Sequence, residues 1–434
     1  MLSQPVHLHM QLDKPRRNTP MGKSTRNRPV RKAECGSGVG PAELLGPDPL
    51  TEALRGKLRE ALVTLFDEEL TQVLGAVKGE RVATRCGYRH GAKARELTTG
   101  LGKVRLALPR GRLFTPAGGE REWESHLLPR YQRRARTVDA ASLGAYLTGA
   151  NSRRIHRALS PLLRGAPLSK SGVSRIVGRL KSLFGEWRSR SLADSALRYL
   201  YLDAIALKVR IARKVVSVPV LVALGVDRQG RKEVLDLELC AAESTSAWAG
   251  FVAGLATRGV QAPVLVILDG SPGLAQAVAA TWPGVAVQRC TVHKLRHLLR
   301  HAPRHAAEGV QADYSRIVSA ASEAEARTAH QRFGAKWRKL APKVAASLLE
   351  AGEALLTFYR FPPSQWKALR TTNAIERLHG EFRRRVKTQG SLPDTQTAEV
   401  LLFGLLASGQ IQMRRIDGWQ DIGLVPVHRS SKAA

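Results

Sequence analysis

Residues 264–293 read VLVILDGSPGLAQAVAATWPGVAVQRCTVH, and this stretch decides the fold class. It opens on an unbroken apolar run, 264–268, which is too short to span a membrane and predicts a buried strand. A helical pattern follows, and a second short strand is expected at 285–287. The first strand ends on Asp269 and Gly270, and open α/β sheets place their chemistry at such a carboxyl end. An Asp-Gly pair is equally typical of a plain turn, so both interpretations stay open at this point.

Charge is the strongest signal in the composition. Lys and Arg number 69 against 36 Asp and Glu, a formal net charge of +33, in a chain of 434 residues that is 43% hydrophobic. That hydrophobic content excludes global disorder, and the length suits two or three domains. The excess of positive charge favours a polyanionic partner, most simply nucleic acid.

The sequence has no apolar run of membrane-spanning length and no signal peptide. Its four cysteines are scattered singly, a pattern that fits a reducing cytosol and not a disulfide framework. We therefore expect a cytoplasmic, nucleoid-associated protein with no membrane partner.

The first part of the chain combines basic segments with local structure. Residues 1–48 are basic and rich in Pro, Gly, Ser and Asn, which predicts a disordered arm that either touches phosphates or is only a solubilising tail. A strong helix is expected over 51–77, and a small β-hairpin over 95–110. The apolar positions expected on one face of that helix are Leu54, Leu58, Ala61, Leu62, Leu65, Phe66, Leu70, Val73 and Leu74.

A helix-turn-helix is predicted over residues 151–183, with a break at Gly165, Ala166 and Pro167. The expected inward positions are Ile155, Ala158, Leu159, Leu162 and Leu163 on the first helix and Val173, Ile176, Val177 and Leu180 on the second. The outer face has small polar residues and arginines, as a helix entering the major groove would. The candidate DNA contacts are Ser171, Ser174, Arg175, Arg179, Arg153 and Arg154. An ordinary helical hairpin on a basic protein is the alternative.

A second apolar run, YLYLDAIALKV at 199–209, is interrupted by Asp203. A lone carboxylate inside a buried strand is costly unless it has a partner such as a metal ion. Strands at 215–226 and 233–239 and a helix at 244–258 follow. The sequence thus predicts an α/β domain whose first and fourth strands each carry an aspartate.

A third carboxylate lies on a predicted helix, TTNAIERLHGEFRRRVK at 371–387, after a polar helical stretch that we interpret as an insertion. Asp203, Asp269 and Glu376 could converge to bind two Mg²⁺ ions, for which Mn²⁺ can substitute, and two such ions serve in-line phosphoryl transfer. Glu376 equally fits a capping box with Asn373, and Glu381 is a rival carboxylate.

Several motifs, taken together and in order, resemble the Mutator-type insertion-sequence transposases of bacteria over about residues 50–420. They are CGYRHG, LTTGLGKVRLALPRG, LLPRYQRR, LSKSGVSRIV, EWRSR, YLYLDAIALKVR, the DG of LDGSPGL, QRCTVH and TTNAIERLHGEFRRRVKTQGSLP. The resemblance implies an RNase H-like catalytic domain with an α-helical insertion, and a DDE triad at Asp203, Asp269 and Glu376. It also implies an N-terminal region that binds the terminal inverted repeats of the element.

The family's Cys-x-x-His signature falls on Cys290 and His293. We expect these two residues, with Asn373 and Arg377, to support the active site. One departure is visible: family members often carry a His-Lys or similar pair before Gly-Leu, where this chain has Ser271 and Pro272.

The expected fold class is α/β, with an RNase H-like domain preceded by a mainly α-helical DNA-binding region that holds the helix-turn-helix and the hairpin. The expected divisions are a basic arm at 1–48, a DNA-binding and dimerisation region at 49–190, a first part of the core at 195–290, the insertion at 291–368, the last part of the core at 369–425 and a loose tail at 426–434.

The recurring Cys290, His293, His297, His301 and His305 also raise the question of a zinc site. We disfavour zinc, because steps of four drift around a helix and Pro303 interrupts the pattern. The sequence favours a transposase that acts on its terminal inverted repeats and on target DNA, as at least a dimer. A non-catalytic DNA-binding regulator or a decayed transposase copy is the alternative.

Overall fold

The computed structural model describes residues 48–425, except 151, 164–169, 388–389 and 393. The tail expected at 426–434 and all but the last residue of the arm expected at 1–48 therefore lie outside the described residues. Within the described part, no helix is both long enough and apolar enough to cross a membrane.

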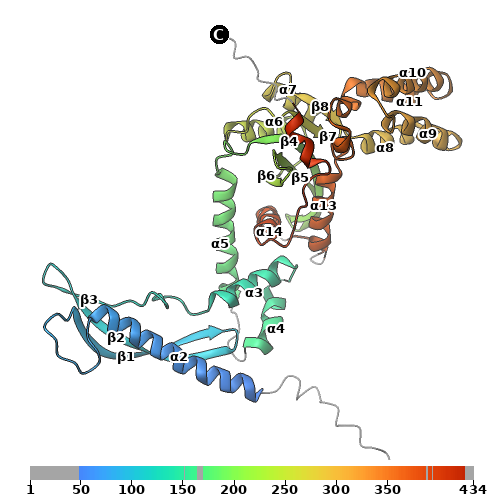
Figure 1. Cartoon of the computed structure of the whole chain (residues 1–434). Coiled ribbons are helices and arrows are strands. Elements are labelled where there is room, and N and C mark those ends of the chain that lie inside the picture. The colour runs from blue at the N-terminus through green and yellow to red at the C-terminus, as the bar shows by residue number, and fades with distance from the viewer. Residues whose placement is uncertain (1–47, 151, 164–169, 388–389, 393, 426–434) are drawn as a thin grey trace, which may run out of the picture. The chain divides into compact units, whose positions relative to one another are not determined.

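The N-terminal part consists of one long helix on a three-stranded antiparallel sheet (Figure 1). The elements are α2 (Pro49–Leu74), β1 (Gly87–Thr99), β2 (Gly102–Phe114) and β3 (Glu120–Glu122), in the strand order β1-β2-β3. The hairpin predicted over 95–110 is confirmed, but its strands are longer and run from Gly87 to Phe114. The sequence did not show the outer ends of the strands, because these ends hold mostly exposed polar residues that give little apolar periodicity.

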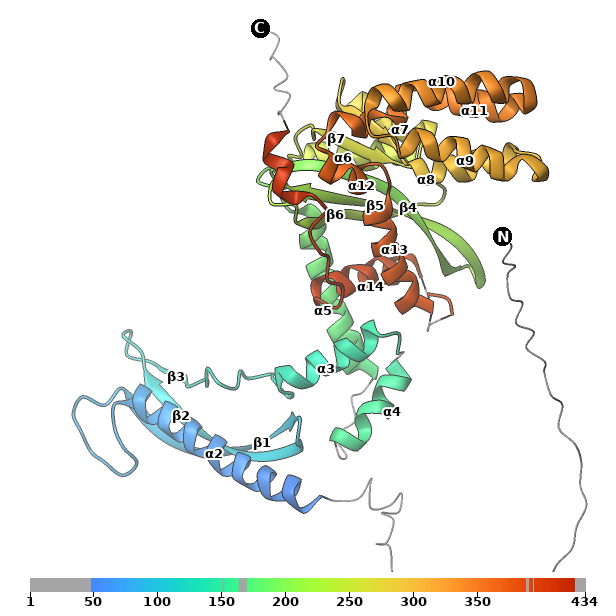
Figure 2. The same cartoon turned by 45° about the vertical axis from the view of Figure 1, so that its right-hand side comes forward.

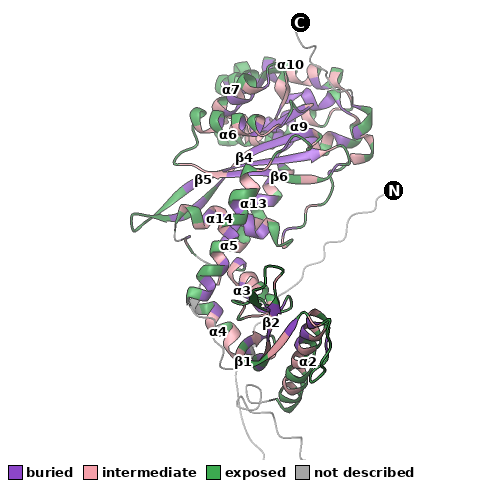
Figure 3. Cartoon of the chain, turned by 90° about the vertical axis from the view of Figure 1, so that its left-hand side faces the viewer, coloured by how far each residue is buried: buried purple, intermediate pink, exposed green. Residues whose placement is uncertain are grey.

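The apolar face of helix α2 was predicted to pack on this chain's core or on a second copy, and part of that face packs within the chain. Phe66, Leu70 and Leu74 are buried, whereas Leu54 is 47% exposed and Leu65 is 46% exposed. Because Leu54 and Leu65 are eleven residues apart, they share one flank of the helix, outside the strip that meets the sheet. Figure 3 shows the contrast between the largely exposed α2 and the buried strands of the larger sheet.

Three helices follow: α3 (Arg136–Leu147), α4 (Ser152–Leu163) and α5 (Lys170–Ser189). They enclose a small core of Val138, Ile155, Leu163, Val173 and Ile176. Helix α3 was not predicted, and α5 runs past the predicted end at 183. The two predicted helices are present, but the turn between them lies outside the described residues. Ala158, expected to point inward, is exposed because it lies off the strip that packs on α3 and α5.

The larger sheet has five strands in the order β6-β5-β4-β7-β8. They are β4 (Leu197–Ile211), β5 (Lys214–Asp227), β6 (Lys232–Leu239), β7 (Leu265–Leu268) and β8 (Ala286–Arg289). Strands β4, β5 and β6 are antiparallel to one another, whereas β7 runs parallel to β4 and β8 parallel to β7. All five strands were predicted within a few residues.

Side-chain alternation along these strands produces two cores. On one face, Leu202 and Leu268 pack with Trp248 and Trp282 from the region of α6 (Thr245–Thr257) and α7 (Pro272–Thr281). On the other face, Tyr201 and Ile267 belong to a cluster with residues of α13 (Asn373–Val386) and α14 (Thr395–Ala407). Helix α6 begins where the Ser244 side chain accepts a hydrogen bond from the Ala247 N–H.

The predicted helical stretch between β8 and α13 is confirmed as a group of helices (Figure 2). These are α8 (Thr291–His301), α9 (Ala307–Val318), α10 (Glu323–Leu340), α11 (Pro342–Ala351) and the short α12 (Trp366–Leu369), with 3-10 turns between them. Trp337 of α10 is 3% exposed and belongs to the core, as expected for a tryptophan.

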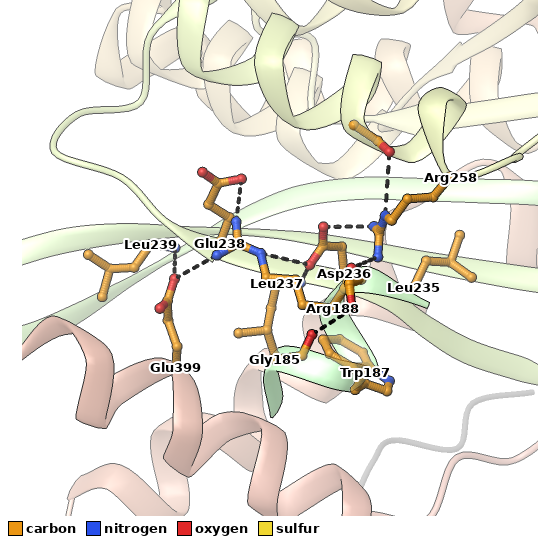
Figure 4. A network of polar contacts seen from close by, with 12 residues as sticks. Gly185, Trp187, Arg188, Leu235, Asp236, Leu237, Glu238, Leu239, Arg258 and Glu399 are labelled. Atoms are coloured by element: carbon orange, nitrogen blue, oxygen red, sulfur yellow. Dashed lines mark hydrogen bonds and ion pairs between the residues drawn. The ribbon is translucent and has the colours of Figure 1, made fainter. Parts of the chain in front are cut away.

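A charged cluster joins the end of α5 to the sheet and to α14 (Figure 4). Arg258 donates to the Asp236 carboxylate at 2.8 Å, and Arg188 lies 3.8 Å from the same carboxylate. Arg188 also lies 2.8 Å from Glu238 and 3.8 Å from Glu399 of α14. The largely buried ion pair of this cluster is Asp236 with Arg258, which joins β6 to the end of α6. Arg188, whose side chain is 35% exposed, attaches the end of α5 to the same carboxylate.

Candidate active site

The two predicted strand aspartates occupy equivalent positions on neighbouring parallel strands. Leu202 of β4 pairs with Leu268 of β7, and Asp203 and Asp269 are the next residues of their chains. Adjacent strands lie about 4.8 Å apart, so the two acids start from neighbouring backbone positions. Alternation directs Asp203 to the same face as Tyr201, where α13 packs against β4 (Figure 2).

The Asp269-Gly270 pair is both a strand end and a turn. The Asp269 Oδ1 accepts a hydrogen bond from the Ser271 N–H at 2.8 Å, and Gly270 has a φ of +101°. A Cβ on Gly270 would lie 2.6 Å from Nε of Arg289, so any other residue here would push the Arg289 guanidinium aside. The turn interpretation of the pair is therefore confirmed, a role for Asp269 in chemistry stays a prediction, and Pro272 begins α7 directly after the turn.

Helix α13 supplies the third carboxylate. It begins at Asn373 with Thr372 as the N-cap residue, and no side chain caps it, so the capping-box interpretation of Glu376 is wrong. Glu376 Oε1 lies 3.3 Å from His293 Nε2 instead, and 3.9 Å from an Arg296 nitrogen. The structure therefore gives Glu376 partners from α8.

The rival carboxylate Glu381 has a different environment. It lies 2.6 Å from Arg384 and also pairs with Arg385, both on its own helix. Hydrogen bonds from Arg385 and Arg384 lower the pKa of Glu381. Because its charge is already matched by neighbours within one turn, Glu381 is a weaker candidate than Glu376.

A buried histidine on α13 contacts the first aspartate. His379 Nδ1 lies 3.4 Å from Asp203 Oδ2, with the two side chains 2% and 12% exposed. The other ring nitrogen, Nε2, is buried and has no hydrogen-bond partner among the described residues. The helical spacing of Ile375, Leu378, His379 and Phe382 predicts that His379 faces the core, but not that it meets Asp203.

Cys290, His293 and Thr372 form a hydrogen-bonded group at the start of α8. The Thr372 N–H and hydroxyl both donate to the buried Cys290 Sγ at 3.3 Å, and the hydroxyl lies 3.4 Å from His293 Nδ1. Burial opposes ionisation of Cys290, but hydrogen bonds from His293 and Thr372 outweigh it and lower the pKa of the thiol. The Cys290 hydrogen bond, aided by the charges of Asp203 and Glu376, raises the pKa of His293 to about 9. Sequence reasoning missed Thr372, although its hydroxyl just before a helix was a visible signal.

A fourth carboxylate, Glu243, also escaped sequence reasoning. It lies just before α6 and accepts a hydrogen bond from the Trp248 indole at 3.2 Å. Burial raises the pKa of Glu243, and the negative charges of Asp269 and Asp203 raise it further. No local pattern marks Glu243, because only the fold brings it near the two aspartates.

The other predicted support residues are not part of this group. Asn373 and Arg377 are exposed, and their side chains make no hydrogen bond or ion pair with the three acids in the described part of the chain. Over the same residues, no set of three or more His, Cys, Asp or Glu side chains is gathered closely enough to hold a metal ion.

The predicted DNA-contact residues on α5 are exposed. Ser171, Ser174, Arg175 and Arg179 all face outward, as does Arg154 on α4. The side chain of Arg153 lies outside the described part. Val173, Ile176 and Leu180 are buried as predicted, so α5 has the expected two-faced pattern.

The fold and this site define an α/β protein with aspartates at neighbouring positions of two adjacent parallel strands, Asp203 within β4 and Asp269 directly after β7. The sequence matches the pattern of the family described as "Transposase, Mutator family" over residues 43–415. It is 35% identical over 362 residues to the transposase for insertion sequence element ISRM5 of Rhizobium meliloti, covering 83% of this chain and 88% of that protein.

Two further relatives have similar coverage. Identity is 31% over 413 residues to the transposase for insertion sequence element IS1081 of Mycobacterium tuberculosis, covering 90% of this chain and 93% of that protein. It is 29% over 349 residues to the transposase for insertion sequence element IS256 in transposon Tn4001 of Staphylococcus aureus, covering 79% and 86%. The chain therefore belongs to the Mutator family of transposases, which confirms the assignment made from its motifs.

Proposed function

We propose that this chain is a DDE transposase that cleaves DNA at the ends of its insertion sequence and transfers the freed strand to target DNA. The observation that carries this proposal is the register of the parallel strands, which sets Asp203 and Asp269 side by side. Glu376, the third candidate acid, lies on α13, which packs on β4.

The topology supports an RNase H-like catalytic domain. The sheet has an antiparallel half, β6-β5-β4, and a parallel half, β7-β8, and the two candidate aspartates lie where the halves meet. This is a switch point in an α/β sheet, where such folds place their ligands. We accordingly retain the division into a core in two parts with a helical insertion between them.

The three carboxylates suit Mg²⁺, with Mn²⁺ as a substitute, because hard cations prefer oxygen ligands. Asp203, Asp269 and Glu376 would hold the ions, which when bound would stabilise the attacking and leaving oxygens of the displaced phosphate. The carboxylates are not gathered into such a set in the described structure, and Glu376 faces His293. We propose that Glu376 exchanges this contact for the ions when DNA is present.

Two successive phosphoryl transfers account for the overall reaction. In the first, a water oxygen bonds to phosphorus at the element end and the 3′ oxygen leaves as a hydroxyl. In the second, that 3′ hydroxyl loses its proton and its oxygen bonds to a phosphorus of the target strand, while the bond from this phosphorus to the target's own 3′ oxygen breaks and that oxygen leaves as a hydroxyl. His293, which is protonated at pH 7 because its pKa is raised to about 9, places positive charge beside the acids that face the phosphate.

The N-terminal part would recognise the terminal inverted repeats. The exposed serines and arginines of α5 support a helix-turn-helix whose second helix contacts DNA. We further propose that two or more chains act together, since transposition requires both ends to be held, and that the protein works in the cytoplasm at the nucleoid.

The test is an outward-facing PCR across joined element ends in cells. We would compare cells that express the unmutated chain, Asp269→Asn, or Asp194→Asn. Asp194 is an exposed aspartate whose side chain makes no hydrogen bond or ion pair within the described residues, so it is a matched control. A junction product with the unmutated and Asp194→Asn chains only is the expected result. An equal product from Asp269→Asn would overturn the proposal.

A further inference from the structure

A basic groove lies beside the candidate active site, between α8 and α11. Its volume is about 890 Å³, and Asp269 and His293 are among the residues that line it. The α8–α11 groove is defined here by Arg296, Arg300, Lys343 and Ser347 in addition to these two. Because Asp269 and His293 belong both to the candidate active site and to the lining of the groove, a strand bound at Asp269 would extend into the groove.

One face of α8 forms a wall of this groove. The lining residues of this helix are His293, Lys294, Arg296, His297, Arg300 and His301. All of them except Lys294 lie three, four, seven or eight residues after His293 or are His293 itself, which places them along a single stripe of the helix. On the opposite side of α8, Leu298 is fully buried in the core. Three of the four histidines that raised the question of zinc, His293, His297 and His301, therefore line the groove.

The facing wall is α11, and it is held rigidly. Glu350 of α11 lies 2.7 Å from Arg289 and 2.8 Å from Lys294, so it binds α11 to both β8 and α8. Ser347 Oγ lies 3.2 Å from His297 Nδ1 and adds a second link across the groove. The groove is thus a built feature whose two walls are joined by polar contacts.

The charge that remains in the groove is positive. Glu350 is matched by two cations, which leaves Asp269 as the unmatched acid of the lining. Arg300 and Lys343 have no carboxylate partner among the described residues, and Arg296 lies 3.9 Å from Glu376. Unpaired cations on two facing helices are suited to a ligand with repeated negative charges.

We propose that the α8–α11 groove binds the phosphodiester backbone of the DNA strand adjoining the scissile phosphate. From His293 to Arg300 the helix advances about 10 Å, at 1.5 Å per residue. That length matches about three nucleotides along one strand of DNA at 3.4 Å each. The inference rests on the proposed function, since DNA at Asp269 fixes where the strand enters.

The test measures how DNA affinity depends on salt. The probe is a duplex that spans the junction between element end and flanking DNA, and divalent ions are left out so that no strand is cut. The groove variant is Arg300→Ala with Lys343→Ala. The matched control is Arg338→Ala with Lys339→Ala, which removes the same charge from exposed positions of α10 that do not line the groove.

We expect the groove variant to lower the slope of log affinity against log salt by about 1.5 to 2, since each lost phosphate contact removes about 0.9. The control variant should keep the slope, and Arg300→Lys, which preserves the charge, should keep it as well. Equal slopes for the groove and control variants would overturn the inference. If the unmutated chain still forms junctions in that case, the proposed function stands without the groove.

Discussion

Gly270 shows how a residue without a side chain shapes the candidate site. Its φ of +101° turns the chain directly after Asp269, and the Arg289 guanidinium occupies the space where a Cβ would be. Arg289 donates to the Gly270 carbonyl at 3.2 Å and pairs with Glu350. A single glycine therefore connects the aspartate to the wall of the basic groove.

We predict that Gly270→Ala disturbs the site more than a glycine substitution without a clash. Gly284→Ala is the matched control, because Gly284 has a φ of +77° and open space around it. Both changes should cost about 1 kcal/mol or more for the left-handed backbone. Gly270→Ala should cost about 1 kcal/mol beyond that, because the Arg289 guanidinium would have to leave its contacts with the Gly270 carbonyl and Glu350. Chemical denaturation measures both, and an equal loss would show that the contact with Arg289 is unimportant.

The residues of the site differ in how far the sequence reveals them. Asp203 and Asp269 were predictable, because a carboxylate that interrupts or ends an apolar strand is visible within a few residues. Thr372 and Glu243 were not, since only tertiary packing brings a helix start and a loop near those aspartates. The contact of His379 with Asp203 joins residues far apart in the chain, so local periodicity could place His379 only in the core.

At the scale of elements, charged contacts hold helices to the sheet at two places. One is the link of α11 to α8 and β8 through Glu350. The other is the cluster at the end of α5, which surrounds Asp236 (Figure 4). The two differ in burial, since the Glu350 side chain is 53% exposed and the Asp236 side chain is 8% exposed. They should therefore respond differently to substitution.

Glu350 should give a pH-dependent contribution to stability. Hydrogen bonds from Arg289 and then Lys294 lower its pKa from 4.5 to about 2. A lowered carboxyl pKa means stability that is present above about pH 4.5 and lost as the pH falls towards 2. Glu350→Gln should cost about 1 kcal/mol at pH 7, allowing for solvent screening, and much less at pH 3. Glu308→Gln, an exposed change on α9, is the control, and a gap in unfolding midpoint that does not shrink at pH 3 would contradict the prediction.

Asp236→Asn should destabilise the chain by about 3 kcal/mol or more, because it leaves the largely buried Arg258 without its carboxylate. Glu238 pairs with Arg188 in the same cluster, and its side chain is 40% exposed. Glu238→Gln should therefore lower the free energy of unfolding by less than about 1 kcal/mol. Urea unfolding of the two variants gives the comparison. Similar losses would mean that burial of Asp236 does not set the strength of this link.

Elements with a clear apolar pattern were predicted well, and elements with few buried apolar residues were not. All five strands of the larger sheet follow apolar runs, so their positions were visible in the sequence. Helix α3 was missed, because its buried residues are Val138, Ser142 and Leu147, which give little apolar periodicity. The outer ends of β1 and β2 were missed as well, since exposed strand residues depend on pairing and not on local preference.

At the scale of the whole molecule, the net charge of +33 and the family membership both point to DNA. We predict that two element ends are held by at least two chains of 47.4 kDa each. Mass photometry of the chain with an excess of end duplex measures this directly. A complex that contains two duplexes and a single chain would refute the expected dimer.

The central claim is that Asp203, Asp269 and Glu376 form one active site for DNA cleavage. The most direct measurement is the cleavage of a labelled end duplex by purified chain in Mg²⁺ and in Mn²⁺, with Glu376→Gln compared with Glu381→Gln on the same helix. We expect Glu376→Gln, Asp203→Asn and Asp269→Asn to cleave the duplex slower by a factor of about a thousand or more, as is typical when one catalytic group is lost. All three variants should bind the duplex as before. Glu381→Gln should cleave at nearly the unmutated rate. Cleavage retained by Glu376→Gln and lost by Glu381→Gln would contradict the assignment of the third carboxylate, and cleavage retained by either aspartate variant would contradict the whole account.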